Sequence, residues 1–107
     1  MTIRFLHTES CHVWQKALVV LEETLSELNL EVSYEVILIK TQKDADNHKF
    51  GGSPTIQIDG FDVDPMAQGV TKYTLSSCRN YVYQNKFYEY PPKEMVLAAL
   101  KRTAEQK

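Results

Sequence analysis

The stretch that decides the fold is residues 3–28, which read IRFLHTESCHVWQKALVVLEETLSEL. It begins with an apolar run of strand-forming residues at 3–6, and the polar residues after it predict a turn. From Trp14 onward, apolar residues recur with the spacing of one helical face, at Ala17, Leu18, Leu21, Leu25 and Leu28. We therefore expect a strand, a turn that contains Cys11, and an amphipathic helix.

Cys11 stands where the predicted turn meets the helix. Ser10 is a suitable N-cap residue, because its hydroxyl can accept a hydrogen bond from a free amide of the first helical turn. This places Cys11 inside that turn, where unpaired amides and the helix dipole favour the thiolate. His12 and Lys16 add positive charge nearby, whereas Glu9 opposes them. Cys11 is therefore a candidate nucleophile; the alternative is a small buried side chain that helps the helix to dock.

Two further segments extend the sheet. Residues 32–39, VSYEVILI, predict a strand that is buried largely on both faces. A strand, a helix and a second strand in this order predict a parallel crossover within one sheet. The polar residues 41–49 predict a short helix or a loop. Residues 55–63, TIQIDGFDV, flank the turn signal Asp59-Gly60 and predict an antiparallel hairpin.

The C-terminal part begins with a segment, residues 66–90, that shows no clear period and contains several tyrosines. It predicts an extended chain with one irregular hairpin. Residues 93–102, KEMVLAALKR, predict a final helix with Pro92 at its first position. The whole order predicts an α/β fold: strand-helix-strand, then a short helix, two strands and a helix around a central four-stranded mixed sheet. At 107 residues, we expect one domain over positions 1–107.

The composition argues against two classes of function, nucleic-acid binding and membrane association. A net charge of −2 provides no broad positive surface for phosphate groups, so we expect no nucleic-acid partner. No apolar stretch approaches the ~18 residues of a membrane span, and the N-terminus does not resemble a signal peptide. We expect a cytoplasmic protein without membrane association. Cysteines in that reducing compartment are more often catalytic, metal-binding or inert than paired in a structural disulfide.

Metal and cofactor chemistry finds little support in the sequence. The histidines and the cysteines show no paired ligand spacing such as C-x2-C or H-x3-H. We therefore expect no metal site and no cofactor. Arg79, next to Cys78, could steer a thiolate or an acidic group, but a solvated arginine is the commoner outcome and is the expectation here.

The element order, the cysteine near the first helix and the SPT tripeptide at residues 53–55 resemble the thioredoxin and glutaredoxin superfamily. The motifs ESCHVW, GSPTIQIDG, SCRNY and YPPKE are similar to a branch of short thioredoxin-like proteins with C-P-x-C, C-P-x-W or selenocysteine sites. The resemblance implies a thioredoxin-like fold with a cis proline facing the cysteine. It also implies that the backbone of Ser53, the residue before that proline, pairs with an extended substrate segment. The substrate-binding residues would then be His12, Trp14, Ser53, Pro54 and Thr55.

Two departures from the superfamily pattern matter. Trp14 occupies the position of the second redox cysteine, so Cys11 has no local resolving thiol. Cys78 becomes the candidate resolving thiol; the alternative is that Cys78 only fills the core. Residues 63–65, VDP, replace the Gly-Gly pair that receives glutathione in glutaredoxins, which argues against tight glutathione binding.

Three functions remain open from the sequence. The first is a single-cysteine thiol-disulfide oxidoreductase that acts through Cys11 on a thiol-containing peptide, a protein or glutathione. The second is a non-catalytic thioredoxin-like protein-binding module. The third is a handler of soft metals or organomercurials that uses Cys11 and Cys78. The position of Cys11 favours the first function, whereas Trp14 in the resolving position favours the second.

Overall fold

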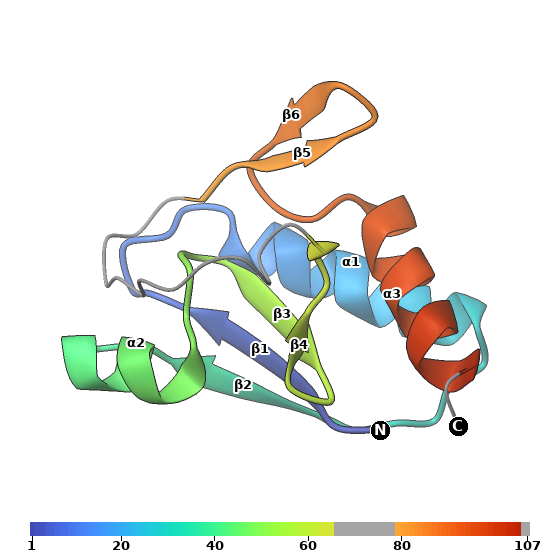
Figure 1. Ribbon diagram of the computed structural model, residues 1–107, viewed down its shortest axis with the longest axis horizontal. Coiled ribbons are helices and arrows are strands. Elements are labelled where there is room, and N and C mark those ends of the chain that lie inside the picture. Colours follow the sequence, from blue (N-terminus) through green and yellow to red (C-terminus); the bar gives the residue numbers. More distant parts are fainter. Residues whose placement is uncertain (66–78, 106–107) are drawn as a thin grey trace.

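Strands β1 (Ile3–His7) and β2 (Tyr34–Leu38) run parallel, and helix α1 (Trp14–Glu27) connects them. The computed structural model describes residues 1–65 and 79–105. In the register of the two strands, Ile3 lies opposite Tyr34 and His7 lies opposite Leu38. The predicted strand-helix-strand crossover is therefore confirmed (Figure 1).

The predicted hairpin is also present. Strand β3 (Thr55–Ile58) runs antiparallel to β1, and β4 (Phe61–Asp62) pairs with β3. Asp59 and Gly60 between them have φ angles of 52° and 84°. Two successive positive φ angles are typical of the tight turn that Asp-Gly favours. The sheet order is β2-β1-β3-β4, so the expectation of an α/β fold with a mixed four-stranded sheet is confirmed.

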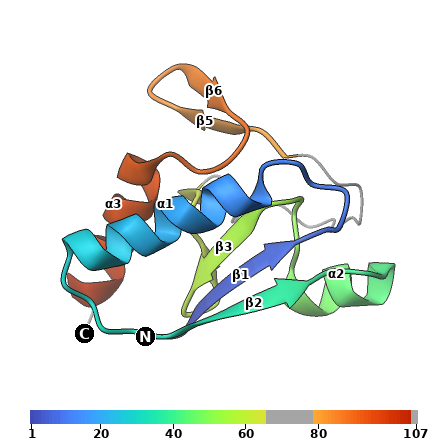
Figure 2. The same ribbon diagram turned by 180° about the vertical axis from the view of Figure 1, so that it is seen from behind.

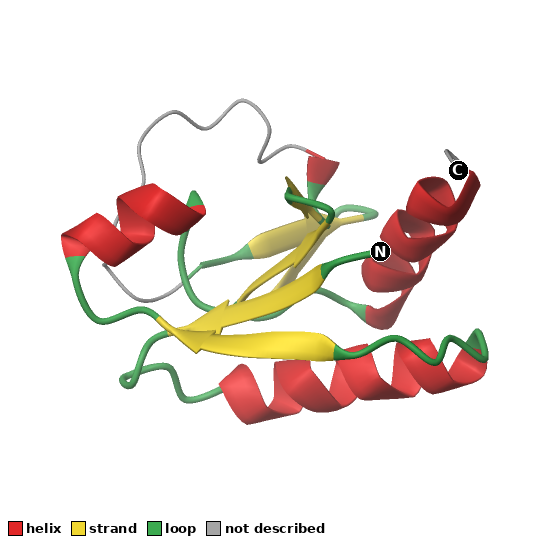
Figure 3. Cartoon of the chain, turned by 90° about the horizontal axis from the view of Figure 1, so that it is seen from below, coloured by secondary structure: helices red, strands yellow, loops and turns green. Residues whose placement is uncertain are grey.

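Helices cover both faces of this sheet. Side chains of β1 alternate between the faces: Ile3 and Phe5 pack with α1 and the C-terminal helix α3 (Lys93–Glu105), whereas Leu6 packs on the other face with Ala45 of α2 (Gln42–His48) and with Phe50. Figure 3 shows α1 along one side of the sheet and α2 on the other. The main core contains residues that the apolar spacing of the first helix predicts, among them Ala17, Leu21 and Leu25. Helix α3 contributes Val96, Ala99 and Leu100 to the same core.

The prediction that the second strand is buried on both faces is wrong. Glu35 is exposed, and Val36 remains 46% exposed. The reason is that β2 lies at the edge of the sheet. Within residues 1–65 and 79–105 it pairs with β1 alone, and the helices that cover the central strands protect it only in part.

The predicted start of the first helix is wrong as well. Helix α1 begins at Trp14, and Val13 precedes it without a side-chain cap. Ser10 lies in a turn, because the amide of Cys11 donates to the carbonyl oxygen of Thr8 at 3.4 Å. The helical ladder begins later, where the amide of Ala17 donates to the carbonyl of Val13. Cys11 therefore lies before the helix rather than in its first turn.

The C-terminal part contains a separate hairpin. Strands β5 (Tyr81–Tyr83) and β6 (Lys86–Tyr88) form a two-stranded sheet, which confirms the irregular hairpin that we predict in this region. The expectations for residues 66–78 fall outside the described residues. Figure 2 shows the hairpin standing apart from the central sheet, beyond α1. Pro92 lies one position before α3 and accepts the amides of Met95 and Val96 through its carbonyl.

Among the helices of the described residues, none is both long and apolar enough to cross a bilayer.

Candidate functional site

Cys11 is a buried, free thiol in the loop of residues 8–13, which we call the Cys11 loop. Only 5% of its surface is exposed. The loop begins directly after β1, a central strand of the sheet, and ends at α1. The carbonyl oxygen of Thr8 organises it by accepting the amide of Cys11 and lying 3.1 Å from Nδ1 of His7. Since a carbonyl oxygen only accepts hydrogen bonds, Nδ1 of His7 is the donor in this contact.

The Ser53–Pro54 peptide bond lies beside this loop and is cis, as the resemblance implies. Residues 52–55 form what we call the cis-proline segment. The amide of Thr8 donates to the side-chain oxygen of Ser53 at 3.1 Å, and the bond is buried. Thr8 thus contacts Cys11 through its carbonyl and Ser53 through its amide, which joins the Cys11 loop to the cis-proline segment.

The hydroxyl of Thr8 is itself unusual. Thr8 is 4% exposed, and its side-chain oxygen has no hydrogen-bond partner among the described residues. Most buried polar side-chain atoms in proteins have a partner, and an unpaired hydroxyl destabilises the folded state. Thr8, which bonds both Cys11 and Ser53, therefore carries a buried hydroxyl that makes no hydrogen bond with the described residues.

Trp14 and His12, two of the predicted substrate-binding residues, lie in different environments. The ring of Trp14 stacks on the imidazole of His7, with centroids 4.1 Å apart and an interplanar angle of 12°. His12 is exposed. Trp14, at the position where the superfamily has its second cysteine, is therefore half-buried and held by an aromatic partner.

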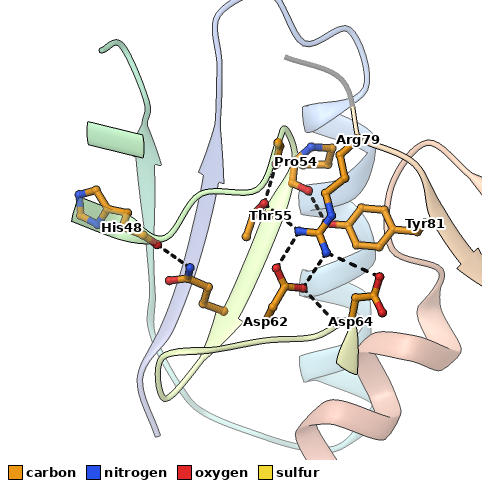
Figure 4. A network of polar contacts seen from close by, with 9 residues as sticks. His48, Pro54, Thr55, Asp62, Asp64, Arg79 and Tyr81 are labelled. Atoms are coloured by element: carbon orange, nitrogen blue, oxygen red, sulfur yellow. Dashed lines mark hydrogen bonds and ion pairs between the residues drawn. The ribbon is translucent and has the colours of Figure 1, made fainter. Parts of the chain in front are cut away.

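Arg79 forms the strongest polar network of the described residues, and sequence reasoning missed it. Its two terminal nitrogens lie 2.7 and 3.0 Å from the two carboxylate oxygens of Asp62, and Nη2 lies 3.7 Å from Asp64. Nη1 also donates to the hydroxyl of Thr55 at 3.0 Å, and the guanidinium lies 4.2 Å from the ring centroid of Tyr81. We call Arg79 with these four partners the Arg79 clamp (Figure 4).

The clamp is buried and formally contains one positive and two negative side chains. The side chain of Arg79 is 9% exposed, so the expectation of a solvated arginine is wrong. Burial alone lowers the pKa of this guanidinium, but the neighbouring carboxylates of Asp62 and Asp64 outweigh it, so the pKa is raised. Burial also raises the pKa of the Tyr81 hydroxyl, which therefore stays protonated. In the sequence, Asp62 and Asp64 stand well before Arg79, and this spacing is too weak a signal to predict the ion pair of Arg79 with Asp62.

The Arg79 clamp contacts the cis-proline segment at several points. The hydroxyl of Thr55 donates to the carbonyl of Gly52, and the hydroxyl of Tyr81 donates to the carbonyl of Pro54. Gly52 has a φ angle of 131°, and a Cβ atom there would lie 2.8 Å from Cβ of Arg79. Glycine is required at this position for its backbone conformation and for the close approach of Arg79.

The structure thus connects Cys11, Ser53, Pro54 and Thr55 through hydrogen bonds, with Trp14 beginning the adjoining helix. Cys78, the candidate resolving thiol, lies outside the described residues. In the described part of the chain, no group of three or more histidine, cysteine, aspartate or glutamate side chains is placed to hold a metal ion.

Comparison with known proteins gives one family match, over residues 3–100, to a domain of unknown function designated DUF2703. No significant match was found among the curated proteins or among the solved structures. The matched range runs from β1 into α3 and includes the Cys11 loop, the cis-proline segment and the Arg79 clamp. Since the match covers most of the chain, this protein belongs to the DUF2703 family of domains of unknown function.

Proposed function

We propose that this chain is a cytoplasmic thioredoxin-like protein that exchanges disulfides through Cys11. The order of its elements supports the fold: a parallel strand pair joined by α1, then α2, an antiparallel hairpin and a final helix. The observation that carries the function is the double contact of Thr8, which bonds both Cys11 and Ser53 next to the cis Ser53–Pro54 bond. A thiol beside a cis proline is the arrangement that the resemblance implies.

Exchange at a single thiol proceeds in two balanced steps. Cys11 releases its proton to solvent, and its thiolate attacks one sulfur of a partner disulfide. A bond forms between Cys11 and that sulfur, while the original bond breaks and the other sulfur leaves as a thiolate. In the second step, the thiolate of an external peptide, protein or glutathione attacks the partner sulfur, forms a disulfide with it and releases Cys11 as a thiolate. If Cys78 resolves the mixed disulfide instead, its thiolate attacks the sulfur of Cys11, the partner leaves as a thiolate, and a Cys11–Cys78 disulfide remains until external thiols reduce it.

Access to the sulfur is the main requirement of this mechanism. Cys11 is 5% exposed, and Ser53 and Thr55 are fully buried. A partner disulfide therefore reacts only after the Cys11 loop or the cis-proline segment has moved. Local opening of this kind costs less free energy than global unfolding and occurs in many folded proteins.

A second candidate is the non-catalytic protein-binding module, and the same burial favours it. The sulfur is shielded, and Trp14, at the position of the second redox cysteine, is occupied by its stack with His7. A chain that binds a partner without chemistry needs no accessible thiol. This alternative predicts that partner binding persists when Cys11 is replaced.

The deciding experiment incubates the full chain with glutathione disulfide and, separately, with a disulfide-linked peptide dimer, and measures adducts by intact mass. Three proteins are compared: wild type, Cys11→Ser and Cys78→Ser. Exchange at Cys11 predicts adducts in wild type and Cys78→Ser, and no Cys11 adduct in Cys11→Ser. Negligible reaction at Cys11 in both wild type and Cys78→Ser contradicts the redox proposal and leaves the binding module.

The same samples test the role of Cys78. If Cys78 resolves the mixed disulfide, the adduct on Cys11 persists longer in Cys78→Ser than in wild type, and an internal disulfide appears in wild type. If both proteins release the adduct at equal rates, an external thiol resolves it. A handler of soft metals predicts instead that mercury binds with one metal per chain and that binding needs both cysteines.

A further inference from the structure

We infer that Arg79 is a positioning residue for Cys11: its clamp holds the cis-proline segment against the Cys11 loop and thereby keeps the thiol buried. The inference takes Cys11 as the reacting thiol of the proposed function, and it concerns the control of access to that thiol. Arg79 contacts neither the sulfur nor the Cys11 loop in any described interaction, so its effect is indirect.

Two residues of the clamp, Arg79 and Tyr81, bind the cis-proline segment directly. Arg79 donates to the Thr55 hydroxyl, which in turn donates to the carbonyl of Gly52. Tyr81, beneath the guanidinium, donates to the carbonyl of Pro54. Arg79 and Tyr81 therefore bind the segment at two points, the hydroxyl of Thr55 and the carbonyl of Pro54, and the Thr55 hydroxyl extends the first contact to Gly52.

Asp62 fixes the position of Arg79 in the clamp. Asp62 binds Arg79 through both carboxylate oxygens, and it lies on β4 directly opposite Gln57 of β3. A bidentate pair of this kind fixes the guanidinium in orientation as well as in position. The clamp therefore ties the cis-proline segment to the rigid β3–β4 hairpin, as the dashed contacts in Figure 4 show.

Thr8 links the cis-proline segment to Cys11. The side chain of Ser53 accepts the amide of Thr8, and the carbonyl of Thr8 accepts the amide of Cys11. If the segment shifts, the amide of Thr8 loses its buried partner, and the turn that packs Cys11 loses its support. Since unpaired buried donors are costly, the turn and the segment are expected to open together.

The experiment measures how fast iodoacetamide alkylates Cys11 in the folded, full-length protein. Digestion after Arg4 and Lys16 gives a peptide, residues 5–16, that contains Cys11 and excludes Cys78, so no background substitution is needed. The variants are Arg79→Met, which keeps the length and removes the charge, and Arg79→Lys, which keeps the charge and removes the bidentate geometry. Arg102→Met is the matched control, because Arg102 is exposed on α3.

We expect Arg79→Met to raise the alkylation rate of Cys11 about tenfold, which corresponds to about 1.4 kcal/mol in the opening equilibrium. Arg79→Lys gives a smaller increase, and Arg102→Met stays within about twofold of wild type, as expected for a surface substitution. Asp62→Asn raises the rate in the same direction. Its effect is less than additive with that of Arg79→Met, because both act on one contact.

Low concentrations of urea distinguish this local effect from general destabilisation. Local opening exposes little surface, so the alkylation rate changes little with urea below the unfolding transition, whereas global unfolding makes it rise steeply. An unchanged rate in Arg79→Met, or an increase that follows urea steeply, overturns the inference. Alkylation involves no disulfide, so the two proposals fail separately. Exchange without an Arg79 effect removes this inference alone, and an Arg79 effect without exchange removes the redox function alone.

Discussion

The main-chain amide of Thr8 donates a hydrogen bond to the side-chain oxygen of Ser53 at 3.1 Å, although 45 positions separate the two residues in the chain. Through this contact the loop after the first strand meets the segment before the third. Both residues are buried, so water cannot replace the bond if one partner is removed. Several predictions concern this contact and the elements around it.

Replacing Ser53 with alanine should destabilise the protein by about 1–3 kcal/mol, because the buried amide of Thr8 would then have no acceptor. Urea unfolding followed by circular dichroism measures the change. Ser26→Ala is the control: Ser26 is exposed on α1, and its replacement should leave stability unchanged or slightly higher. Equal stability of Ser53→Ala and wild type would contradict the importance of this bond.

Thr8→Val should behave in the opposite way. Valine keeps the shape of threonine and removes a buried hydroxyl that has no partner among the described residues. Stability should stay the same or rise by about 1 kcal/mol, as judged by thermal unfolding. If the hydroxyl takes part in exchange at Cys11, adduct formation slows while stability is kept. A clear loss of stability would show that the hydroxyl already has an important partner.

Three glycines form a matched series: Gly51 and Gly52 lie near Arg79, and Gly60 lies in the turn between β3 and β4. Gly60→Ala meets no atom within 4 Å but needs a φ angle of 84°, and we expect a cost of about 1–2 kcal/mol. Gly52→Ala adds a contact of 2.8 Å with Cβ of Arg79 to an unfavourable φ of 131°, so its cost should be larger. Gly51→Ala meets only ordinary contact at 4.0 Å and should be the mildest. Denaturant unfolding of all three variants tests this order, and a milder Gly52→Ala than Gly60→Ala would refute it.

The pair of Arg79 and Asp62 should show strong coupling in stability. Removing Arg79 leaves Asp62 and Asp64 largely buried without their counter-charge, and a loss of this kind typically destabilises a protein by about 3–5 kcal/mol. Removing Asp62 should cost less, because Arg79 keeps Asp64 at 3.7 Å. Replacing both with leucine should cost clearly less than the sum of the two single changes. A double-mutant cycle on urea unfolding measures the coupling. Additive effects would mean that the pair contributes little beyond two independent side chains.

Asp44 should make stability depend on pH at the start of α2. The amide of Lys40 hydrogen-bonds its carboxylate and is the largest cause that lowers the pKa of Asp44 below its usual 3.8; contacts with Thr41 act in the same direction. A lowered folded pKa means that the stabilisation is complete above the unfolded value and is lost as the pH falls through the folded value. The urea midpoint of Asp44→Asn should therefore lie below that of wild type at pH 7, and the difference should shrink below pH 3.8. A difference that is independent of pH would show that the carboxylate charge is not responsible.

Much of the fold was predictable because its signals are local. The period of the apolar residues indicates α1, the segment of residues 93–102 after Pro92 indicates α3, and Asp59-Gly60 indicates the tight turn between β3 and β4. The errors arose where a neighbour distant in sequence decides the outcome. β2 carries an apolar run, yet it lies at the edge of the sheet. Ser10 has the chemistry of a helix cap, yet the amide of Cys11 is already bonded to Thr8, and α1 starts later.

The same distinction between local and distant signals applies to the residues of the candidate site. A cysteine close to the first helix and a proline in the SPT tripeptide could be selected from the sequence, because a nucleophile and a rigid turn are identified by residue type. Their connection through Thr8 could not, since it depends on a hydrogen bond between segments that meet only in the folded chain. Arg79 was interpreted as a surface residue, because nothing next to it in sequence indicates burial.

By itself, the sequence of residues 3–28 determined a strand, a cysteine-containing loop and an amphipathic helix, since apolar periodicity and turn propensity are properties of neighbouring residues. Only the tertiary structure decided that Cys11 lies before the helix, that it is buried, and that Asp62 and Arg79 hold the cis-proline segment beside it. Burial and ion pairing depend on which distant segments pack together, and that information is contained in the whole chain rather than in any one stretch of it.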